Sequence, residues 1–227
     1  ASPTFVAPLF QYYNAGFSSS IQIQNTGSAS TDVTVQYTPS FGGNACTETK
    51  TIAAGAAETF GLFAFNSAIA GSNCYAQNPG TAFVGSATVA TNSANQPLVA
   101  IVNQHNFTTG KAAAYSAFRP TDGTQKVSLP LVMDRNSNYW TGITVYNAGS
   151  AATTVTIDYS ASSADQSFSL AAGESKIVLN NGAIGDKYVG SAVVSGANAS
   201  DKLLVIVNQQ NLVAAGDTFY VYNGFNY

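Results

Sequence analysis

The sequence has few charged residues. Only 8% of its 227 residues are Asp, Glu, Lys or Arg, whereas an average soluble domain has roughly 25%. The eight cations are scattered along a chain of net charge −3, so they do not form the basic stripe with which proteins bind nucleic acid. A surface of Ser, Thr, Asn, Gln and Gly repels its neighbours weakly, which favours close packing against other copies.

Long hydrophobic runs are also absent. The longest, Leu98–Val102 and Leu203–Val207, have the length of a strand and fall far short of the roughly 20 residues of a membrane span. The chain begins at Ala1 without an initiator Met, as a protein does once a secretory signal has been removed. We therefore expect no membrane span and a secreted, extracellular or cell-surface protein.

Residues that carry chemistry are scarce. His105 is the single histidine, and a lone His forms neither a catalytic triad nor a typical zinc site. The eleven carboxylates are dispersed, and none forms a pair that recurs along the chain. We therefore predict no catalytic residue, no metal and no cofactor. Carboxylates far apart in sequence can meet in space, so a polysaccharide hydrolase stays open as a third function.

The chain contains two cysteines, Cys46 and Cys74. An even count in an exported protein predicts one disulfide, and closing a loop of this length would stabilise the fold by about 3–4 kcal/mol. Two free buried thiols are the alternative.

An internal repeat organises the chain. The segment Val6–Tyr37 aligns with Ser128–Tyr159 at a constant offset of 122, and Val84–Ala87 aligns with Val189–Ala192 at an offset of 105. The first copy therefore has about 17 extra residues between Tyr37 and Val84. Because both cysteines lie in this stretch, we predict that the disulfide staples an insertion that the second copy does not need.

The repeated segments have the pattern of β-strands. Polar and apolar residues alternate, as in half-buried strands, in Ser20–Gln24, Asp32–Tyr37, Thr141–Tyr146 and Thr153–Tyr159. The apolar runs Val99–Val102 and Leu203–Val207 predict central strands buried on both faces. Turns are predicted at Asn25–Gly27, Asn147–Gly149, Ala54–Gly55 and Ala172–Gly173.

Seven or eight short strands in each copy predict an all-β protein. Its expected architecture is two tandem immunoglobulin-like β-sandwich domains that arise from the internal repeat. The first covers residues 1–119 and includes the insertion, and the second covers residues 120–227. The polar linker Arg119–Gly123 marks the boundary.

The order of these motifs resembles a known group of proteins. A strand, an Asn-x-Gly-Ser turn, a Val-x-Val strand and an Ala-Ala-Gly turn follow one another, as in the immunoglobulin-like adhesion repeats of bacterial cell-surface proteins. The Gly-Ser-Ala and Val-Asn-Gln strands resemble repeat domains in secreted proteins of filamentous bacteria. The resemblance implies a surface location and a sandwich fold, and it supplies no active-site residues.

Several residues are candidates for binding or modification. Asp134–Asn138 has the spaced oxygen ligands that open a calcium loop, but it lacks the Gly and Glu of such loops, so a hydrogen-bonded turn is the favoured interpretation. Tyr139 and Trp140 could stack on sugar rings, with an inward core position as the alternative. Asn106 and Asn198 lie in glycan acceptor patterns.

We consider two functions of different classes. The first is a structural subunit of an extracellular polymer such as a filament, sheath or surface layer, assembled with itself through head-to-tail and terminal-strand contacts. The second is a secreted carbohydrate-binding or adhesion module whose partner is a polysaccharide. The residues expected at the interface between copies are Phe5, Val6, Phe219, Tyr220, Tyr222, Phe225 and Tyr227.

Overall fold

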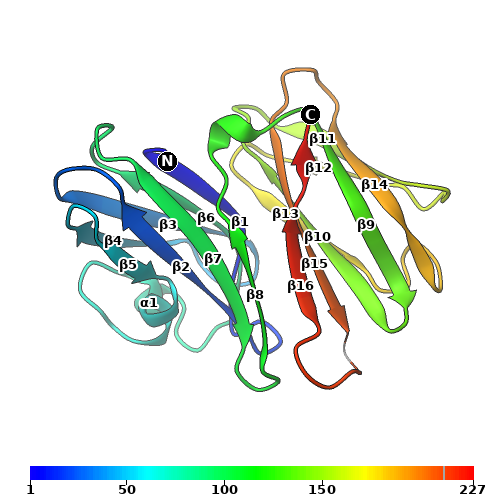
Figure 1. Cartoon of the computed structure of the whole chain (residues 1–227), viewed down its shortest axis with the longest axis horizontal. Helices are drawn as coiled ribbons and strands as arrows, with labels where there is room; N and C mark the ends of the chain where they lie inside the picture. The colour runs from blue at the N-terminus through cyan, green and yellow to red at the C-terminus, as the bar shows by residue number, and fades with distance from the viewer. Residues whose placement is uncertain (212) are drawn as a thin grey trace. The chain divides into compact units, whose positions relative to one another are not determined.

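The structure is a computed structural model that describes residues 1–211 and 213–227. Strands make up most of the chain, which divides into two compact units, Ala1–Arg119 (unit 1) and Pro120–Tyr227 (unit 2) (Figure 1). The predicted all-β fold class is confirmed. No helix among the described residues has the length and apolar character needed to cross a membrane.

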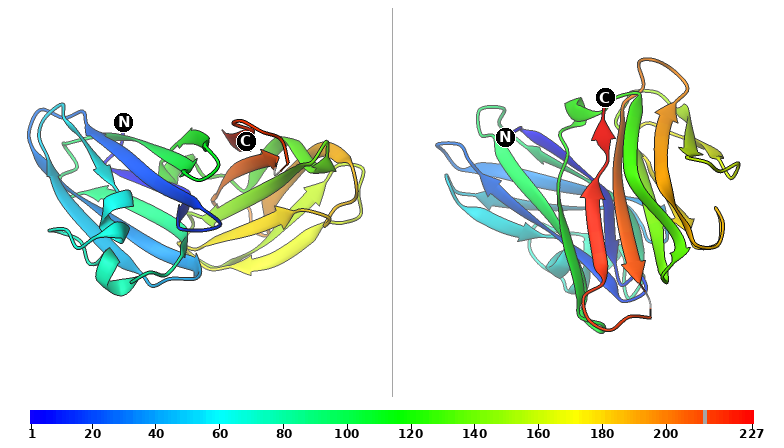
Figure 2. Two further views of the ribbon diagram at one scale, coloured as in Figure 1. Left: turned by 90° about the horizontal axis from the view of Figure 1, so that it is seen from below. Right: turned by 45° about the vertical axis from the view of Figure 1, so that its right-hand side comes forward.

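Unit 1 is a sandwich of two antiparallel sheets with four strands each. One sheet has, in spatial order, β1 (Thr4–Tyr12), β6 (Phe83–Thr91), β3 (Thr31–Phe41) and β4 (Cys46–Ile52). The other has β5 (Ala57–Phe60), β2 (Phe17–Asn25), β7 (Leu98–Asn106) and β8 (Lys111–Ser116). Two short helices, α1 (Leu62–Asn66) and α2 (Cys74–Gln77), follow β5, and α1 lies against the strands (Figure 2).

Unit 2 repeats this order of strands. A turn of 3-10 helix (Pro120–Asp122) precedes a first layer of β9 (Lys126–Asn136), β14 (Tyr188–Gly196), β11 (Thr153–Tyr159) and β12 (Gln166–Leu170). The second layer has β13 (Ser175–Asn180), β10 (Tyr139–Asn147), β15 (Leu203–Asn211) and β16 (Phe219–Asn223). Unlike the layers of unit 1, the two layers are joined in one sheet, because β10 also pairs with β9. The short last strand β17 (Phe225–Asn226) pairs with β9.

Alternating side chains build the core of each unit. In unit 2 the cluster includes Val127 and Leu129 from β9, and Val205 and Val207 from β15. The expectation that Val99–Val102 is buried on both faces is wrong. Ala100 and Val102 are buried, whereas Val99 and Ile101 are exposed, because β7 has an open outer face at these two positions.

A bulge interrupts the first strand of each unit at the same place. The register shifts between Ala7 and Phe10 in β1, and between Leu129 and Val132 in β9. A bulge leaves backbone groups outside the ladder, and a tyrosine of the opposite layer satisfies one of them. The hydroxyl of Tyr115 donates to the Leu9 carbonyl (2.6 Å).

The same bond recurs in unit 2, where the Tyr222 hydroxyl donates to the Leu131 carbonyl (2.5 Å). Burial raises the pKa of Tyr222 to about 12, against the opposing effect of this hydrogen bond. Tyr222 was expected at an interface between copies. Its hydroxyl instead joins the two layers of its own unit.

A buried asparagine closes the end of each sandwich. The Asn25 side chain donates to the carbonyls of Ala29 (2.7 Å) and Ile52 (3.1 Å) and accepts from the Gly27 N–H (2.9 Å). Its own carbonyl accepts from Gly55 (2.9 Å), which has a φ of 71°, a conformation that favours glycine.

Asn147 makes the equivalent bonds in unit 2. Its side chain donates to Ala151 (2.9 Å) and Leu170 (3.1 Å) and accepts from Gly149 (2.9 Å). The repeated Asn-x-Gly and Ala-Ala-Gly motifs are therefore confirmed as turns, and one asparagine side chain ties them together in each unit.

Each unit should unfold more easily when its asparagine is replaced. Asn25→Ala and Asn147→Ala each remove the donor to one buried and one partly buried carbonyl, which should lower the free energy of unfolding by about 3 kcal/mol. Asn198 is exposed, so Asn198→Ala should change it by less than about 0.5 kcal/mol. Chemical denaturation measures all three. Equal effects at Asn25 and Asn198 would contradict the assigned role.

Candidate functional site

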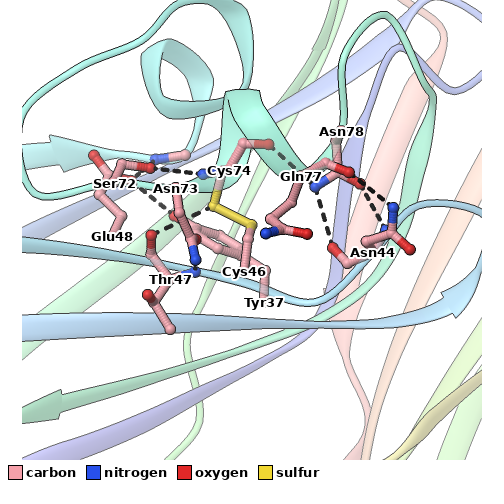
Figure 3. The surroundings of a disulfide bond; sticks show 11 residues. Tyr37, Asn44, Cys46, Thr47, Glu48, Ser72, Asn73, Cys74, Gln77 and Asn78 are labelled. Atoms are coloured by element: carbon pink, nitrogen blue, oxygen red, sulfur yellow. Dashed lines mark hydrogen bonds between the residues drawn. A yellow bond between two sulfur atoms is a disulfide. The ribbon is translucent and has the colours of Figure 1, made fainter.

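The edge of β4 is covered by the insertion of unit 1 (Figure 3). The N–H of Thr49 donates to the Gly71 carbonyl (2.7 Å), and the N–H of Asn73 donates to the Thr47 carbonyl (3.2 Å). The N–H of Thr47 in turn donates to Oδ1 of Asn73 (2.8 Å). The segment Gly71–Asn73 therefore occupies the backbone groups that an edge strand would otherwise expose.

The disulfide fastens this cover to the strand that it protects. Cys46 opens β4, Cys74 opens α2, and their sulfurs are bonded with the Cα atoms 4.9 Å apart, so the predicted disulfide is confirmed. Beyond it, Asn78 bonds to the backbone of Asn44 in both directions, accepting at 2.6 Å and donating at 3.1 Å. Figure 3 shows the bond between Thr47 and Asn73 on one side of the sulfurs and the bonds between Asn44 and Asn78 on the other.

A buried carboxylate lies beneath the insertion. Glu48 accepts from the Tyr37 hydroxyl (3.1 Å) and the Gly61 N–H (2.7 Å), and it pairs with Lys50 (3.1 Å). Burial, and then the Glu48 charge, raise the pKa of Tyr37. The sequence analysis missed Glu48, although the alternation of Cys46–Ile52 places it on the inward face together with Cys46 and Ile52.

Aromatic side chains fill the rest of this region. The rings of Phe10, Tyr37 and Phe83 surround Phe65 of α1 at centroid distances of 5.1–5.5 Å. A fully buried Phe side chain contributes about 1.5–3 kcal/mol. The insertion is therefore part of the core of unit 1 as well as a cover for β4.

In the described part of unit 2, the corresponding edge has no such cover. β12 is the last strand of its layer, and no isolated bridge to it is found within residues 1–211 and 213–227. The connection Asn181–Lys187 stands where unit 1 has Gly61–Ala82. Ser167 and Ser169 are exposed along β12. Sequence reasoning did not single out this edge, because an edge depends on which strands become neighbours.

The candidate calcium loop is a hairpin turn. Ser137 and Asn138 have φ values of 49° and 66°, and Ala15 and Gly16 have the same left-handed conformation at the corresponding place in unit 1. This pair is typical of a type I′ turn. Within the described residues, no three His, Cys, Asp or Glu side chains are grouped so as to hold a metal ion.

Asp134 at this hairpin is held by hydrogen bonds from the backbone. Its side chain is buried and accepts the N–H groups of Gly182 (2.5 Å), Ile184 (2.7 Å) and Gly185 (3.2 Å). Burial favours a higher pKa, but these bonds and the nearby Arg135 outweigh it, so the pKa of Asp134 lies below its ordinary value of 3.8.

The residues predicted for an interface are divided between the interior and the surface. Phe5, Val6 and Phe219 are buried, whereas Tyr220, Phe225 and Tyr227 are exposed by 53%, 60% and 66%. Both ends of the chain pair inside their own units: β1 with β6, and β17 with β9. Phe5 and Val6 are therefore core residues of unit 1 and form no exposed contact surface.

The candidate glycan acceptors differ in environment. Asn106 is buried, and its Nδ2, the atom that a glycan would modify, donates to the Ala15 carbonyl (3.1 Å). Asn211 makes the same bond to Ser137 (3.0 Å) in unit 2. Asn198 is exposed beside Asp201. The geometry thus leaves Asn198 as the accessible acceptor of the two.

Tyr139 and Trp140 lie next to each other at the start of β10, and both are only partly exposed. The ring of Tyr139 is 6.0 Å from that of Tyr220, and Nε1 of Trp140 is enclosed without a hydrogen-bond partner among the described residues. His105 contacts the ring of Phe107 at 4.0 Å, and burial lowers its pKa.

Comparison of the chain with protein families, with curated proteins and with solved structures finds no match.

Opening the disulfide should loosen the cover of β4. The Cys46→Ser/Cys74→Ser variant removes a link whose loss costs about 3–4 kcal/mol, so backbone amides of β4 should exchange with deuterium much faster than in the parent protein. Hydrogen–deuterium exchange resolved by peptide measures this effect. β12 is the internal control and should exchange at an unchanged rate; equal acceleration in both strands would contradict a local role.

Asp134 should make the free energy of unfolding depend on pH in the acidic range. Because the pKa of Asp134 is lowered in the folded protein, its contribution to the free energy of unfolding is complete at pH values above the ordinary pKa of 3.8. That contribution is lost as the pH falls through the pKa of the folded state. Asp134→Asn should lower the free energy of unfolding by about 2 kcal/mol at neutral pH and flatten its decline in acid. Urea denaturation at a series of pH values measures both effects. Asp158→Asn is the control, since Asp158 is exposed on β11, and it should behave like the parent protein.

Proposed function

We propose that this chain is a non-catalytic structural subunit of an extracellular polymer, built from two tandem immunoglobulin-like β-sandwich domains. Copies of the chain join when the uncovered edge of β12 accepts an extended strand of a neighbouring copy. The observation that carries the proposal is the difference between the two units, in which the same edge is sealed in one and open in the other.

The orientation of the backbone along β12 supports this role. The N–H of Ala197 donates to the Thr154 carbonyl (3.0 Å), so Thr154 directs its backbone groups toward β14 and Val155 directs its groups toward β12. Val155 pairs with Phe168. Because successive residues of a strand point their backbone groups to opposite sides, Ser167 and Ser169 direct theirs away from the sheet.

In unit 1 the corresponding outward backbone groups bind another segment of the chain. Thr49 corresponds to Ser167 in the register of the repeat, and its N–H is bonded to Gly71 of the insertion. Natural proteins usually protect exposed edges, because an edge is a template for strand addition by another chain. An edge that is protected in one repeat and unprotected in the other is suited to a contact between copies.

The surface of the chain is compatible with assembly. Only 8% of the residues are charged, so few like charges oppose the approach of a second copy. The exposed side chains of β12 are hydroxyls. When the accepted strand is not β12 itself, the contact is heterologous, and repeated heterologous contacts that do not close produce an open polymer.

The buried carboxylates support a role other than catalysis. Glu48 is held by one backbone N–H group and Lys50, and Asp134 by three backbone N–H groups and Arg135. Both stabilise the fold of their own unit.

The proposal predicts that one proline will weaken assembly. Concentrated parent protein should form filaments or sheets visible by electron microscopy. Ser167→Pro removes the outward N–H and adds a ring at the edge, a position where folded proteins tolerate proline. It should raise the concentration needed for assembly at least about tenfold, the equivalent of about 1.4 kcal/mol.

Ser167→Ala is the matched control, because it loses the hydroxyl and keeps the N–H. It should assemble like the parent protein. Circular dichroism establishes that both variants are folded. A parent protein that stays monomeric at high concentration would overturn the proposal, and so would equal assembly of the proline and alanine variants.

A further inference from the structure

The hairpin between β1 and β2 presents an exposed tyrosine. Tyr13 is exposed by 67% and has a φ of 53°. The backbone at this position is left-handed, and its N–H donates to the hydroxyl of Ser18 (3.2 Å). The ring of Tyr13 meets the ring of Tyr12 edge-on at 4.8 Å.

The insertion carries a second exposed tyrosine on α2, which packs against α1. Tyr75 follows the disulfide-bonded Cys74 directly and is exposed by 43%. Asn66 ends α1, and its Oδ1 accepts a bond from the Tyr12 hydroxyl (3.3 Å). Burial, and then the neighbouring hydroxyls of Tyr13 and Tyr75, raise the pKa of Tyr12. Tyr12 thus contacts both Tyr13 and Asn66 at one end of unit 1, and α2, which packs against α1, carries Tyr75.

The hairpin backbone itself does not require these aromatic residues. Unit 2 has the same hairpin, and Arg135, at the position that corresponds to Tyr13, has a φ of 51°. Asp134 stands where unit 1 has Tyr12, and the described part of unit 2 has no counterpart of α1 and α2. The same backbone geometry therefore carries an aromatic cluster in one unit and a charged pair in the other.

We infer that Tyr13 and Tyr75, together with the Tyr12 hydroxyl and the Asn66 amide, form a binding site for a neutral polysaccharide. Tyrosine rings provide apolar faces with a polar rim, which matches the C–H face and the hydroxyl groups of a sugar ring. None of the four side chains is charged, so the site suits an uncharged polymer.

A protein partner is the weaker choice. The core of a protein interface is apolar and fully desolvated, whereas this cluster has no aliphatic member, and its exposed residues Tyr13, Tyr75 and Asn66 carry hydroxyl and amide groups. The disulfide and the core ring of Phe65 hold the insertion in place, so little side-chain order has to be gained on binding. The site is separate from β12, and this activity goes beyond the proposed assembly.

The test measures retention on insoluble cellulose, chitin, xylan, β-1,3-glucan and starch. It uses the Ser167→Pro protein as background, so that multivalent assembly does not add to the affinity and the outcome is independent of the assembly proposal. At least one polysaccharide should retain the protein. Tyr13→Ala and Tyr75→Ala should each weaken binding about tenfold, and Tyr13→Phe, which keeps the ring, should restore most of it.

Tyr220→Ala is the matched control, because Tyr220 is an exposed tyrosine of unit 2, and this variant should bind like the background protein. Failure of all five polysaccharides to retain the protein would overturn the inference. Unchanged binding by folded Tyr13→Ala and Tyr75→Ala variants would also overturn it. Loss of binding in Tyr220→Ala alone would indicate that the sugar binds beside Tyr139. That outcome would reject the site on unit 1.

Discussion

The architecture of each unit depends on side chains that satisfy backbone carbonyls between the two layers of its sandwich. Asn25 and Asn147 bind the carbonyls at the ends of β4 and β12. Tyr115 and Tyr222 bind the carbonyls exposed by the bulges of β1 and β9. A buried carbonyl without a donor costs about 1–3 kcal/mol, so these bonds hold the two layers in a single register. The repeat preserves them while much of the surrounding sequence differs.

The insertion of unit 1 is added to this shared framework without disturbing it. The segment covers β4, places Phe65 in the core and donates the Gly61 N–H to the buried Glu48 carboxylate. Gly61 makes the entry possible, because its φ is 92° and a Cβ there would lie 2.5 Å from the ring of Phe10. Unit 2 keeps the framework without the cover. The two units therefore offer different surfaces on one scaffold, and the two proposed activities follow from that difference.

Much of the fold was accessible from sequence pattern. The period of two in Asp32–Tyr37 and Thr153–Tyr159 correctly predicted β3 and β11, and the glycines after Asn25 and Asn147 predicted the turns. The pattern failed at Val99–Val102, where a continuous apolar run was interpreted as burial on both faces. Hydrophobicity alone does not show whether a second layer covers a strand, and Val99 and Ile101 are exposed on the outer face of β7.

The sequence by itself determined the repeat, the strands, the turns and the pairing of its only two cysteines, because each of these follows from local periodicity, from backbone preference or from a count. The tertiary structure alone decided that Phe5 and Val6 lie in the core, that Gly71–Asn73 closes the edge of β4, and that Tyr12 of β1 bonds to Asn66 of the insertion. Edges, covers and clusters depend on contacts between residues far apart in the chain. Such contacts arise only when the layers pack.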